Sequence, residues 1–248
     1  MIRKGADLKK AVYASLLLFS TLFAEDYYPK IDVCQSLGIN VEHLKTEELR
    51  SVCEDFIPSS LQKQTVLEAL NDAGDDFGYI IDSLRQEGVP DVVVFLAVVE
   101  SKFSRKYINK KIYAGVWQLS TSEAKYFGLA INKKSRQDER RDLQKATSVI
   151  IKILKANYDE FGSWPLAIIA YNAGEYRLKN AIKKAGTKDI EVLLYGKKKY
   201  LPRTTSNYLK RIIIYASAAN YPPLYDRINS MFRVKVNFED TNETNATN

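Results

Sequence analysis

The sequence has few of the residues from which metal and cofactor sites are built. Its 248 residues include one histidine, His43, and two cysteines, Cys34 and Cys53. Zinc sites need several Cys, His, Asp or Glu ligands close together, and no cluster of Cys and His occurs here. The sequence also lacks a glycine-rich nucleotide loop and internal repeats at solenoid periods. We therefore expect neither a metal nor a cofactor.

The two cysteines permit one disulfide bond in an oxidising compartment. The alternative is two separately buried thiols, because the sequence does not give the distance between Cys34 and Cys53.

The N-terminal segment has the charge and hydropathy profile of a secretory signal peptide. Four basic residues precede an apolar run over residues 11–24, which Glu25 and Asp26 follow directly. This run is shorter than the about 20 apolar residues of a membrane-spanning helix. We expect cleavage after Ala24 and a periplasmic location. An uncleaved membrane anchor is the alternative, because Leu22 fits the small-residue cleavage pattern poorly.

Composition indicates one globular domain that binds an anionic polymer. The chain is 46% hydrophobic and 27% charged, which suits a domain with a substantial core. Its formal charge of +7 falls to +4 without residues 1–24, which hold four basic residues and one acidic residue. A basic surface suits nucleic acid as well as an acidic cell wall. Export excludes nucleic acid and leaves the wall as the expected partner.

The rest of the chain predicts a series of helices, marked by capping boxes, apolar periodicity and terminal glycines. The apolar run 92–99 suits a strand or a buried helix, and Pro90 favours the helix. A short edge strand is predicted where Phe232, Val234, Val236 and Phe238 alternate with polar residues, before a disordered tail. The predicted helices cover residues 59–74, 77–88, 90–99, 120–128, 143–162, 163–174, 178–186 and 204–222, the last with Thr204, Thr205 and Ser206 as caps.

Glu100 directly follows the apolar run 92–99. If that run is a core helix, the carboxyl group is partly desolvated, and desolvation raises the pKa of a carboxyl group. A glutamic acid that is protonated near neutral pH can donate a proton to a glycosidic oxygen, as in lysozyme. The alternative is a glutamate at a helix end that points into solvent.

Three motifs follow one another in the order and spacing of a known family: Glu100–Phe103, Ala114–Leu119 and Ala170–Gly174. Together they resemble the lytic transglycosylase family with its SLT domain, especially the membrane-bound murein members of type D. The resemblance covers residues 88–220 and includes the segment 138–142. It implies a mainly helical, lysozyme-like domain with a catalytic groove between helices.

The resemblance implies cleavage of the bond between N-acetylmuramic acid and N-acetylglucosamine in peptidoglycan. Glu100 would protonate the leaving oxygen while the N-acetyl group of the substrate stabilises the sugar carbon. Glu100 would then accept the proton of the muramic acid 6-hydroxyl, which closes a 1,6-anhydro ring. This scheme needs no second carboxylate, unlike the usual pair.

By the same resemblance Ser101 helps to orient the acid, Gln118 lies in the groove, and Tyr171 hydrogen-bonds near Glu100 and the sugar. Asn172 holds the turn that positions these residues, and Tyr208 is a groove or packing residue. Their structural alternatives are a helix hydroxyl for Ser101, a cap for Gln118 and a core side chain for Tyr171.

One segment departs from the family pattern, because Thr204 stands where relatives usually have glutamate. This puts in doubt a carboxylate contribution from residues 201–208, although the threonine hydroxyl can bond the backbone or the substrate. Lys197–Lys199 either meet acidic stem peptides or form a solvated loop. Trp117 and Trp164 offer stacking faces for sugars, with core packing favoured for Trp164.

We expect four regions: a signal peptide over 1–24, an N-terminal helical segment over 25–74 packed on the catalytic domain, an SLT domain over 75–222 and a C-terminal extension over 223–248. No wall-binding LysM repeat is visible, so wall attachment falls to the groove, the N-terminal segment or other cell-wall enzymes. Two alternatives remain. One is a goose-type muramidase that uses water, with Glu123, Asp138, Asp142 and Glu175 as candidate water activators. The other is a non-catalytic wall-binding scaffold.

Overall fold

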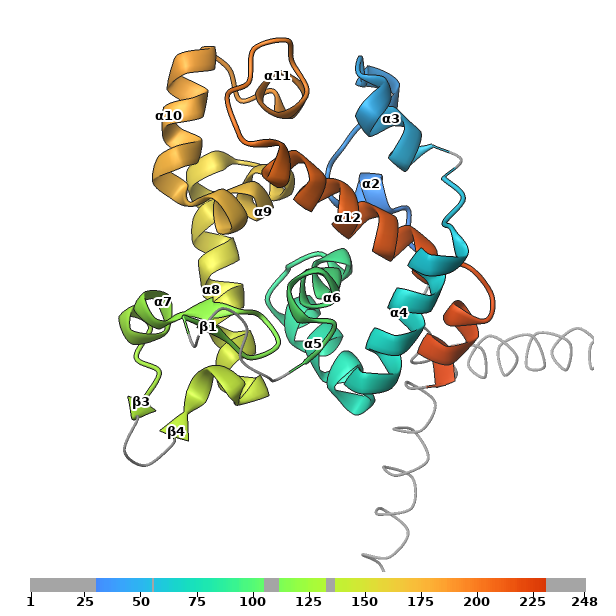
Figure 1. Ribbon diagram of the computed structural model, residues 1–248, viewed down its shortest axis with the longest axis vertical. Helices are drawn as coiled ribbons and strands as arrows, with labels where there is room; N and C mark the ends of the chain where they lie inside the picture. Colours follow the sequence, from blue (N-terminus) through green and yellow to red (C-terminus); the bar gives the residue numbers. More distant parts are fainter. Residues whose placement is uncertain (1–29, 55, 105–111, 133–136, 231–248) are drawn as a thin grey trace, which may run out of the picture. The chain divides into compact units, whose positions relative to one another are not determined.

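The structure is a computed structural model that describes residues 30–54, 56–104, 112–132 and 137–230. Residues 30–227 form one compact unit, and residues 228–230 belong to a second unit. The first unit is mainly helical, which confirms the predicted fold class (Figure 1). The expected signal peptide and the expected strand over residues 232–238 lie outside the described residues.

Eleven α-helices of the described residues carry the fold, with three short 3-10 helices, η1 (Val41–His43), η2 (Asp91–Val94) and η3 (Glu139–Arg141). The α-helices are α2 (Val33–Ser36), α3 (Glu47–Cys53), α4 (Ser60–Ala73), α5 (Asp75–Gln86), α6 (Phe95–Ser101), α7 (Thr121–Tyr126), α8 (Leu143–Phe161), α9 (Trp164–Ala173), α10 (Glu175–Ala185), α11 (Ile190–Leu194) and α12 (Arg203–Ala219).

Local signals in the sequence set most helix ends. Ser59 with Gln62 and Ser120 with Glu123 form the predicted capping boxes of α4 and α7, each satisfying two backbone N–H groups. Gly162 takes a left-handed conformation and ends α8. The apolar run after Pro90 is helical, as predicted, although its first turn is the 3-10 helix η2.

The predicted caps of the last helix were wrong. α12 begins at Arg203, and the preceding Pro202 makes no side-chain cap. Thr205 and Ser206 are buried inside the helix, and the Ser206 hydroxyl donates to the Arg203 carbonyl oxygen at 2.9 Å. Their hydroxyl groups therefore follow the helix backbone, and tertiary burial outweighs the preference of Thr and Ser for caps.

α12 is the central helix of the first unit. It packs against α4, α6 and α9 and also contacts α2, α3 and α11 (Figure 1). Its buried residues include Leu209, Ile212 and Ile213, and burying one such side chain stabilises a fold by about 1.5–3 kcal/mol. This packing holds α12 directly beside α6, the helix that carries Glu100.

The segment before α5 has an internal disulfide bond and polar contacts to α11. Cys34 and Cys53 form a disulfide bond between α2 and α3. The backbone N–H groups of Lys45 and Thr46 donate to the Glu191 carboxylate at 2.9 and 2.6 Å. Burial acts to raise the pKa of Glu191, but the hydrogen bond from the Thr46 hydroxyl and those from the two amides outweigh it, so the pKa is lowered. Glu191 is therefore an ionised anchor for this segment.

Four two-residue strands form two antiparallel ladders that the sequence did not predict. β1 (Tyr113–Ala114) pairs with β2 (Leu119–Ser120), and β3 (Ile131–Asn132) pairs with β4 (Gln137–Asp138). The first ladder encloses the second motif. Within the described ranges, no helix has the length and apolarity that crossing a membrane requires.

Candidate active site

Glu100 lies near the end of α6, where the chain turns sharply. After Ser101, the last residue of the helix, Lys102 and Phe103 have positive φ angles of 53° and 61°. The amide of Lys102 still donates to the Val98 carbonyl oxygen at 3.1 Å, so the helix ends just after Glu100. Non-glycine residues in this conformation are uncommon and are enriched at functional sites. The turn leaves Glu100 half-buried.

Tyr208 of α12 is the direct partner of Glu100. Its hydroxyl donates to Glu100 Oε1 at 2.6 Å. Burial raises the pKa of Tyr208 well above its usual value, and the neighbouring Glu100 charge raises it further. Tyr208 therefore keeps its proton at neutral pH and acts as a hydrogen-bond donor.

The surroundings of Glu100 favour its protonated form. Burial raises the pKa of the carboxyl group, and this effect exceeds the opposing effects of the Tyr208 hydrogen bond and of the Arg211 charge. The negative charge of Glu123 raises the pKa slightly more. A carboxyl group whose pKa is raised by burial beside a cavity has the property required of a general acid.

The Glu100 side chain lines a cavity of about 710 Å³. The cavity lies between the end of α6, the β1–β2 ladder, the start of α7 and the junction of α9 with α10. Its lining is mostly polar, which suits a hydroxylated ligand more than an apolar one. The lining residues are Glu100, Ile112, Tyr113, Gln118, Ser120, Ser122, Glu123, Tyr171, Asn172, Ala173, Gly174 and Arg177.

The three sequence motifs meet at one turn, residues 115–118. Ser101 of the first motif donates its hydroxyl to the Val116 carbonyl oxygen at 2.7 Å. Tyr171 of the third motif donates its hydroxyl to the Trp117 carbonyl oxygen at 2.6 Å. Gln118 has a positive φ of 53°, and its side-chain amide donates to the Gly115 carbonyl oxygen at 2.7 Å. The motifs therefore hold one another at the cavity wall.

Four predicted site residues line this cavity together: Glu100, Gln118, Tyr171 and Asn172. Asn172 is exposed there, and its side chain makes no hydrogen bond to any part of the chain that the structure describes. Ser101 is buried, does not line the cavity, and supports the turn through Val116. Tyr208 lies beneath Glu100 and is not part of the lining.

Tyr171 hydrogen-bonds near Glu100 and not to it, and the expectation of a stacking face at Trp117 is wrong. Tyr171 donates to the Trp117 backbone, and the hydrogen bond to Glu100 comes from Tyr208. Trp117 is fully buried, with its indole N–H donating to Thr147 Oγ1 at 3.0 Å, so it offers no stacking face. Trp164 is half-buried and packs on the Tyr158 ring, with 4.4 Å between ring centroids.

A buried ion pair that the sequence did not reveal stabilises the cavity wall. Arg140 and Asp138 pair at 2.8 Å, with side chains 2% and 3% exposed. Arg140 also donates to the Ile112 and Leu119 carbonyl oxygens, at 2.7 and 3.2 Å, on the two arms of the β1–β2 segment. At Gly115, an added Cβ atom would lie 1.8 Å from the Arg140 carbonyl oxygen, so this position requires glycine.

The structure separates the four candidate water activators. Asp138 is in the buried ion pair, Asp142 caps α8 by accepting from the Lys145 amide, and Glu175 pairs with Lys179. Glu123 alone among the four lines the cavity, and it also caps α7 through the Ser120 amide. Thr204, the departure from the family pattern, is exposed in the first turn of α12.

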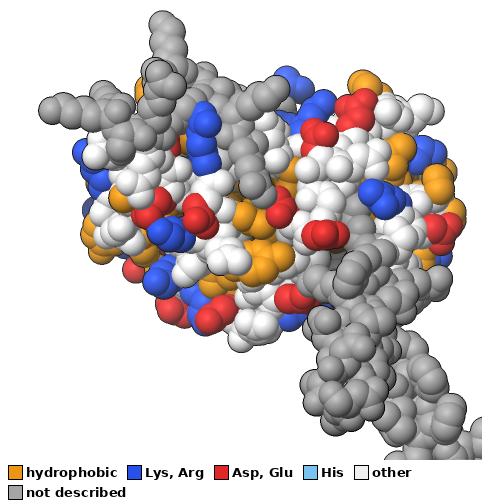
Figure 2. All heavy atoms as spheres, turned by 90° about the horizontal axis from the view of Figure 1, so that it is seen from below, with side chains coloured by type: hydrophobic (Ala, Val, Ile, Leu, Met, Phe, Trp, Pro, Cys, Tyr) orange, Lys and Arg blue, Asp and Glu red, His pale blue; other side chains and the backbone are white. Residues whose placement is uncertain are grey.

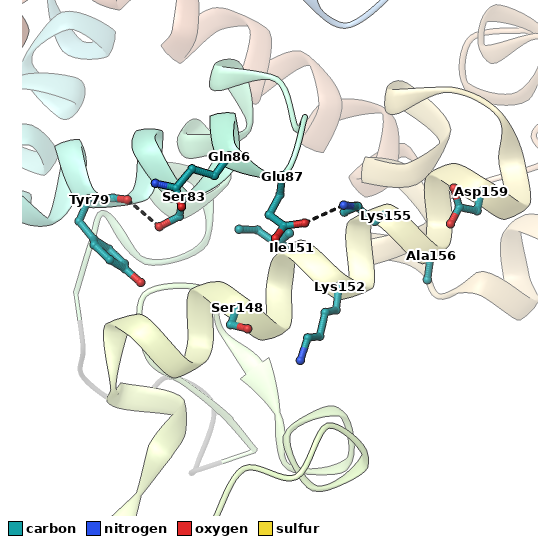
Figure 3. Close-up of a pocket in the computed structure, with 10 residues that line it drawn as sticks. All are labelled: Tyr79, Ser83, Gln86, Glu87, Ser148, Ile151, Lys152, Lys155, Ala156 and Asp159. Carbon is teal, nitrogen blue, oxygen red and sulfur yellow. Dashed lines mark hydrogen bonds and ion pairs between the residues drawn. The ribbon is translucent and has the colours of Figure 1, made fainter. Parts of the chain in front are cut away.

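Another pocket, of about 430 Å³, lies between α5 and α8 and has different chemistry (Figure 3). Glu87 faces Lys155 across it, at 2.7 Å. The Lys155 hydrogen bond lowers the pKa of Glu87, which keeps this carboxylate ionised. An exposed, ion-paired carboxylate is unsuited to proton donation, so Glu100 is the better candidate acid. In the described ranges, no three His, Cys, Asp or Glu side chains are grouped to hold a metal ion.

Lysozyme, a glycan-cleaving enzyme, likewise has a partly buried carboxyl group of raised pKa at its active site. Comparison with known families agrees, because residues 79–194 match the family model described as the Transglycosylase SLT domain. Over this segment the chain is similar to the SLT domain of lytic transglycosylases. The match includes Glu100, Gln118, Tyr171 and Asn172 and ends before Tyr208.

Two relatives are the membrane-bound lytic murein transglycosylases D of Escherichia coli strains K12 and O6:H1. Each is 30% identical to this chain over 139 residues, 54% of this chain. A protein of Alteromonas sp. (strain M-1) named for tributyltin chloride resistance is 30% identical over 111 residues, 44% of this chain and 53% of its own length. The chain spans 29% of the length of the two Escherichia coli relatives.

Proposed function

We propose that the protein is a peptidoglycan lytic transglycosylase with Glu100 as its acid and base. The observation that carries this proposal is the half-buried Glu100 carboxyl group, which opens into a polar cavity and has a raised pKa. The match of residues 79–194 to the SLT domain model and the murein activity in the names of the Escherichia coli relatives support the substrate class. The expected signal peptide and the membrane-bound relatives support action in the periplasm on glycan strands.

In the proposed reaction, the Glu100 carboxyl group donates its proton to the glycosidic oxygen between N-acetylmuramic acid and N-acetylglucosamine. The bond from that oxygen to the muramic acid C1 breaks, and the substrate's acetamido group stabilises the positive charge at C1. The Glu100 carboxylate then takes the proton of the 6-hydroxyl group as its oxygen bonds to C1. The products are a free N-acetylglucosamine hydroxyl and a 1,6-anhydro end, and no water is consumed.

Other cavity residues have proposed roles in this reaction. Gln118 and Asn172 bind the glycan from the cavity wall, and Tyr208 holds the Glu100 carboxyl group in place. Tyr171 and Ser101 act through the turn at residues 115–118, because their hydroxyl groups bond its carbonyl oxygens. These two are positioning residues.

The test is digestion of purified sacculi with mass analysis of the soluble products. Each product should be lighter by one water than its hydrolytic counterpart. Glu100→Gln should fold normally, bind sacculi and lose about 100-fold to 10,000-fold in rate. Glu87→Gln is the matched control, because this glutamate lines the pocket between α5 and α8 and should leave the rate unchanged. Release by Glu100→Gln at the wild-type rate would refute the assignment.

A hydrolytic muramidase is the second candidate, because Glu123 lines the same cavity as Glu100. In that reaction Glu123 would activate a water molecule, and every product would carry a reducing end. Products with reducing ends, together with a rate loss of more than about 100-fold in Glu123→Gln, would favour it. Anhydro ends with an active Glu123→Gln variant would exclude it. A scaffold without turnover would release no product in either case.

A further inference from the structure

A basic pocket of about 290 Å³ lies between the first turns of α12 and residues of α3, α11 and the loop before α12. The residues of α12 that line it are spaced by three and four positions, so they share one face of the helix. Tyr208, which bonds Glu100, projects from a different face. The residues that matter here are Glu48, Tyr195, Lys199, Arg203, Asn207 and Lys210.

Positive charge in this pocket is poorly balanced. Lys199, Arg203 and Lys210 line it with one acidic residue, Glu48. Within the described ranges, none of the three cations has a carboxylate oxygen within 4 Å. Lys199 Nζ lies 3.5 Å from the Gly196 carbonyl oxygen, and Lys210 lies over the Tyr195 ring at 5.2 Å.

The sequence around the pocket also has charges of one sign only. Between residues 195 and 219 the chain has six basic residues and no acidic one. By contrast, basic and acidic side chains are interspersed over the face of the molecule shown in Figure 2. The excess of basic residues in this pocket is therefore a local feature, and the net positive charge of the whole chain does not account for it.

The pKa of Lys210 is lowered in this pocket. Burial lowers the pKa of its ammonium group, the carboxylate of Glu48 acts in the opposite direction, and the like charge of Arg203 lowers the pKa further. Two cations that face one small cavity repel each other, and partial burial weakens the screening by water. A bound anion would remove this repulsion and accept charge-assisted hydrogen bonds from both groups.

We propose that this pocket binds the free carboxylates of peptidoglycan peptides, outside the cavity that holds the scissile bond. The proposal rests on the proposed function, which makes the cell wall the substrate. The two sites share α12, because Tyr208 touches Glu100 and its neighbour Asn207 lines the pocket. In this proposal a wall peptide occupies the pocket while glycan fills the cavity.

The pocket gives Lys199 a defined role. Lys197, Lys198 and Lys199 are all exposed in the loop before α12, but of the three only Lys199 lines the pocket with Arg203. Only one lysine of the basic run is therefore placed to bind a carboxylate in this pocket.

The test measures binding of the full chain, carrying Glu100→Gln to stop turnover, to purified sacculi. Arg203→Ala with Lys210→Ala removes two charges from the pocket. Lys183→Ala with Lys184→Ala removes two charges from exposed positions in the last turn of α10 and is the matched control. We expect the apparent Kd for peptide-bearing sacculi to rise on the order of tenfold in the pocket variant and less than about twofold in the control.

Two further substrates identify the bound group. On glycan freed of its peptides by an amidase, the pocket and control variants should bind equally. On sacculi treated to remove phosphate-containing accessory polymers, the difference between them should persist. A difference that survives removal of the peptides, or one that disappears with the phosphate polymers, would overturn the proposal. So would equal weakening of both variants on peptide-bearing sacculi, because net charge would then explain binding.

Failure of this proposal is distinguishable from failure of the proposed function. Binding of the Glu100→Gln chain needs no turnover, whereas the function is decided by the mass of the products that the wild type releases. Circular dichroism of both double variants checks that each is folded.

Discussion

Replacing Tyr208 by phenylalanine removes one hydroxyl group and leaves the ring that packs in α12. The hydroxyl donates to Glu100 Oε1 at 2.6 Å, and this hydrogen bond lowers the pKa of Glu100 against the effect of burial. Hydrogen bonds to charged groups contribute about 1.5–3 kcal/mol, and one pKa unit corresponds to about 1.4 kcal/mol. Tyr208→Phe should therefore raise the pKa of Glu100 by about 1–2 units.

The sign follows from which form of Glu100 the hydroxyl stabilises. Tyr208 stabilises the carboxylate, so its loss extends the protonated form to higher pH. The alkaline limb of kcat/KM against pH reports the acid of the free enzyme and should move to higher pH by the same 1–2 units. A carbon NMR titration of the Glu100 carboxyl group measures the same shift without turnover. The control is Tyr221→Phe, which removes a hydroxyl that donates to the Phe56 carbonyl oxygen at 3.3 Å.

An alkaline limb that stays in place, or moves to lower pH, would refute this reasoning in a variant with a wild-type melting temperature. Tyr208 would then be a packing residue of α12. The charge of Arg211, which also lowers the pKa of Glu100, would then be the next candidate for the group that sets this pKa.

Three other changes test the stability of the cavity wall and of the N-terminal segment. Glu100→Gln should stabilise the fold at neutral pH by about 1.4 kcal/mol for each unit by which the pKa of Glu100 is raised, because the ionised carboxylate is disfavoured in the folded state. This gain should vanish in acid, below the usual pKa of glutamate, where the wild-type side chain is protonated in both states. Urea unfolding at several pH values measures the difference in the free energy of unfolding, and a difference that does not change with pH contradicts the prediction. Gly115→Ala should cost more than about 2 kcal/mol, because the added Cβ meets the Arg140 carbonyl oxygen at 1.8 Å and φ is +78°; a variant with unchanged urea midpoint would show that the turn adjusts. Cys34→Ser with Cys53→Ser should cost about 3 kcal/mol for a closed loop of 19 residues, measured by calorimetry, and an unchanged melting temperature would refute it.

Most helix ends could be predicted from the sequence because local chemistry sets them, whereas Gln118, Tyr171 and Asn172 were predicted by the resemblance to a known family. Ser59 and Ser120 each bond an amide three residues ahead, so both partners lie within one short stretch. Gly162 and Gly115 have positive φ, which a side chain opposes. Signals of this kind need no knowledge of the rest of the fold.

Features that depend on distant partners could not be predicted in the same way. Arg140 lies in a segment rich in charged residues, which reads as solvated. Its burial depends on carbonyl oxygens of Ile112 and Leu119, which lie 28 and 21 residues away and become acceptors only when β1 and β2 pair. The sequence likewise predicts Thr205 and Ser206 as helix caps. Both are buried because α12 packs in the core, and this packing cannot be seen in the local sequence.

The hydrogen-bond partners of Tyr171 and Tyr208 could not be predicted from the sequence motifs. Tyr171 and Tyr208 both lie on helices that pack near Glu100, and the sequence does not show which of the two hydroxyl groups bonds the Glu100 carboxyl group. Tyr208 reaches Glu100 from 108 residues away, because α12 packs directly on α6, whereas the Tyr171 hydroxyl is used by the Trp117 carbonyl oxygen. A motif thus identifies which side chains gather at the cavity. Which of them changes the pKa of Glu100 depends on packing between helices, and that makes the pH profile of Tyr208→Phe the sharpest test of the site.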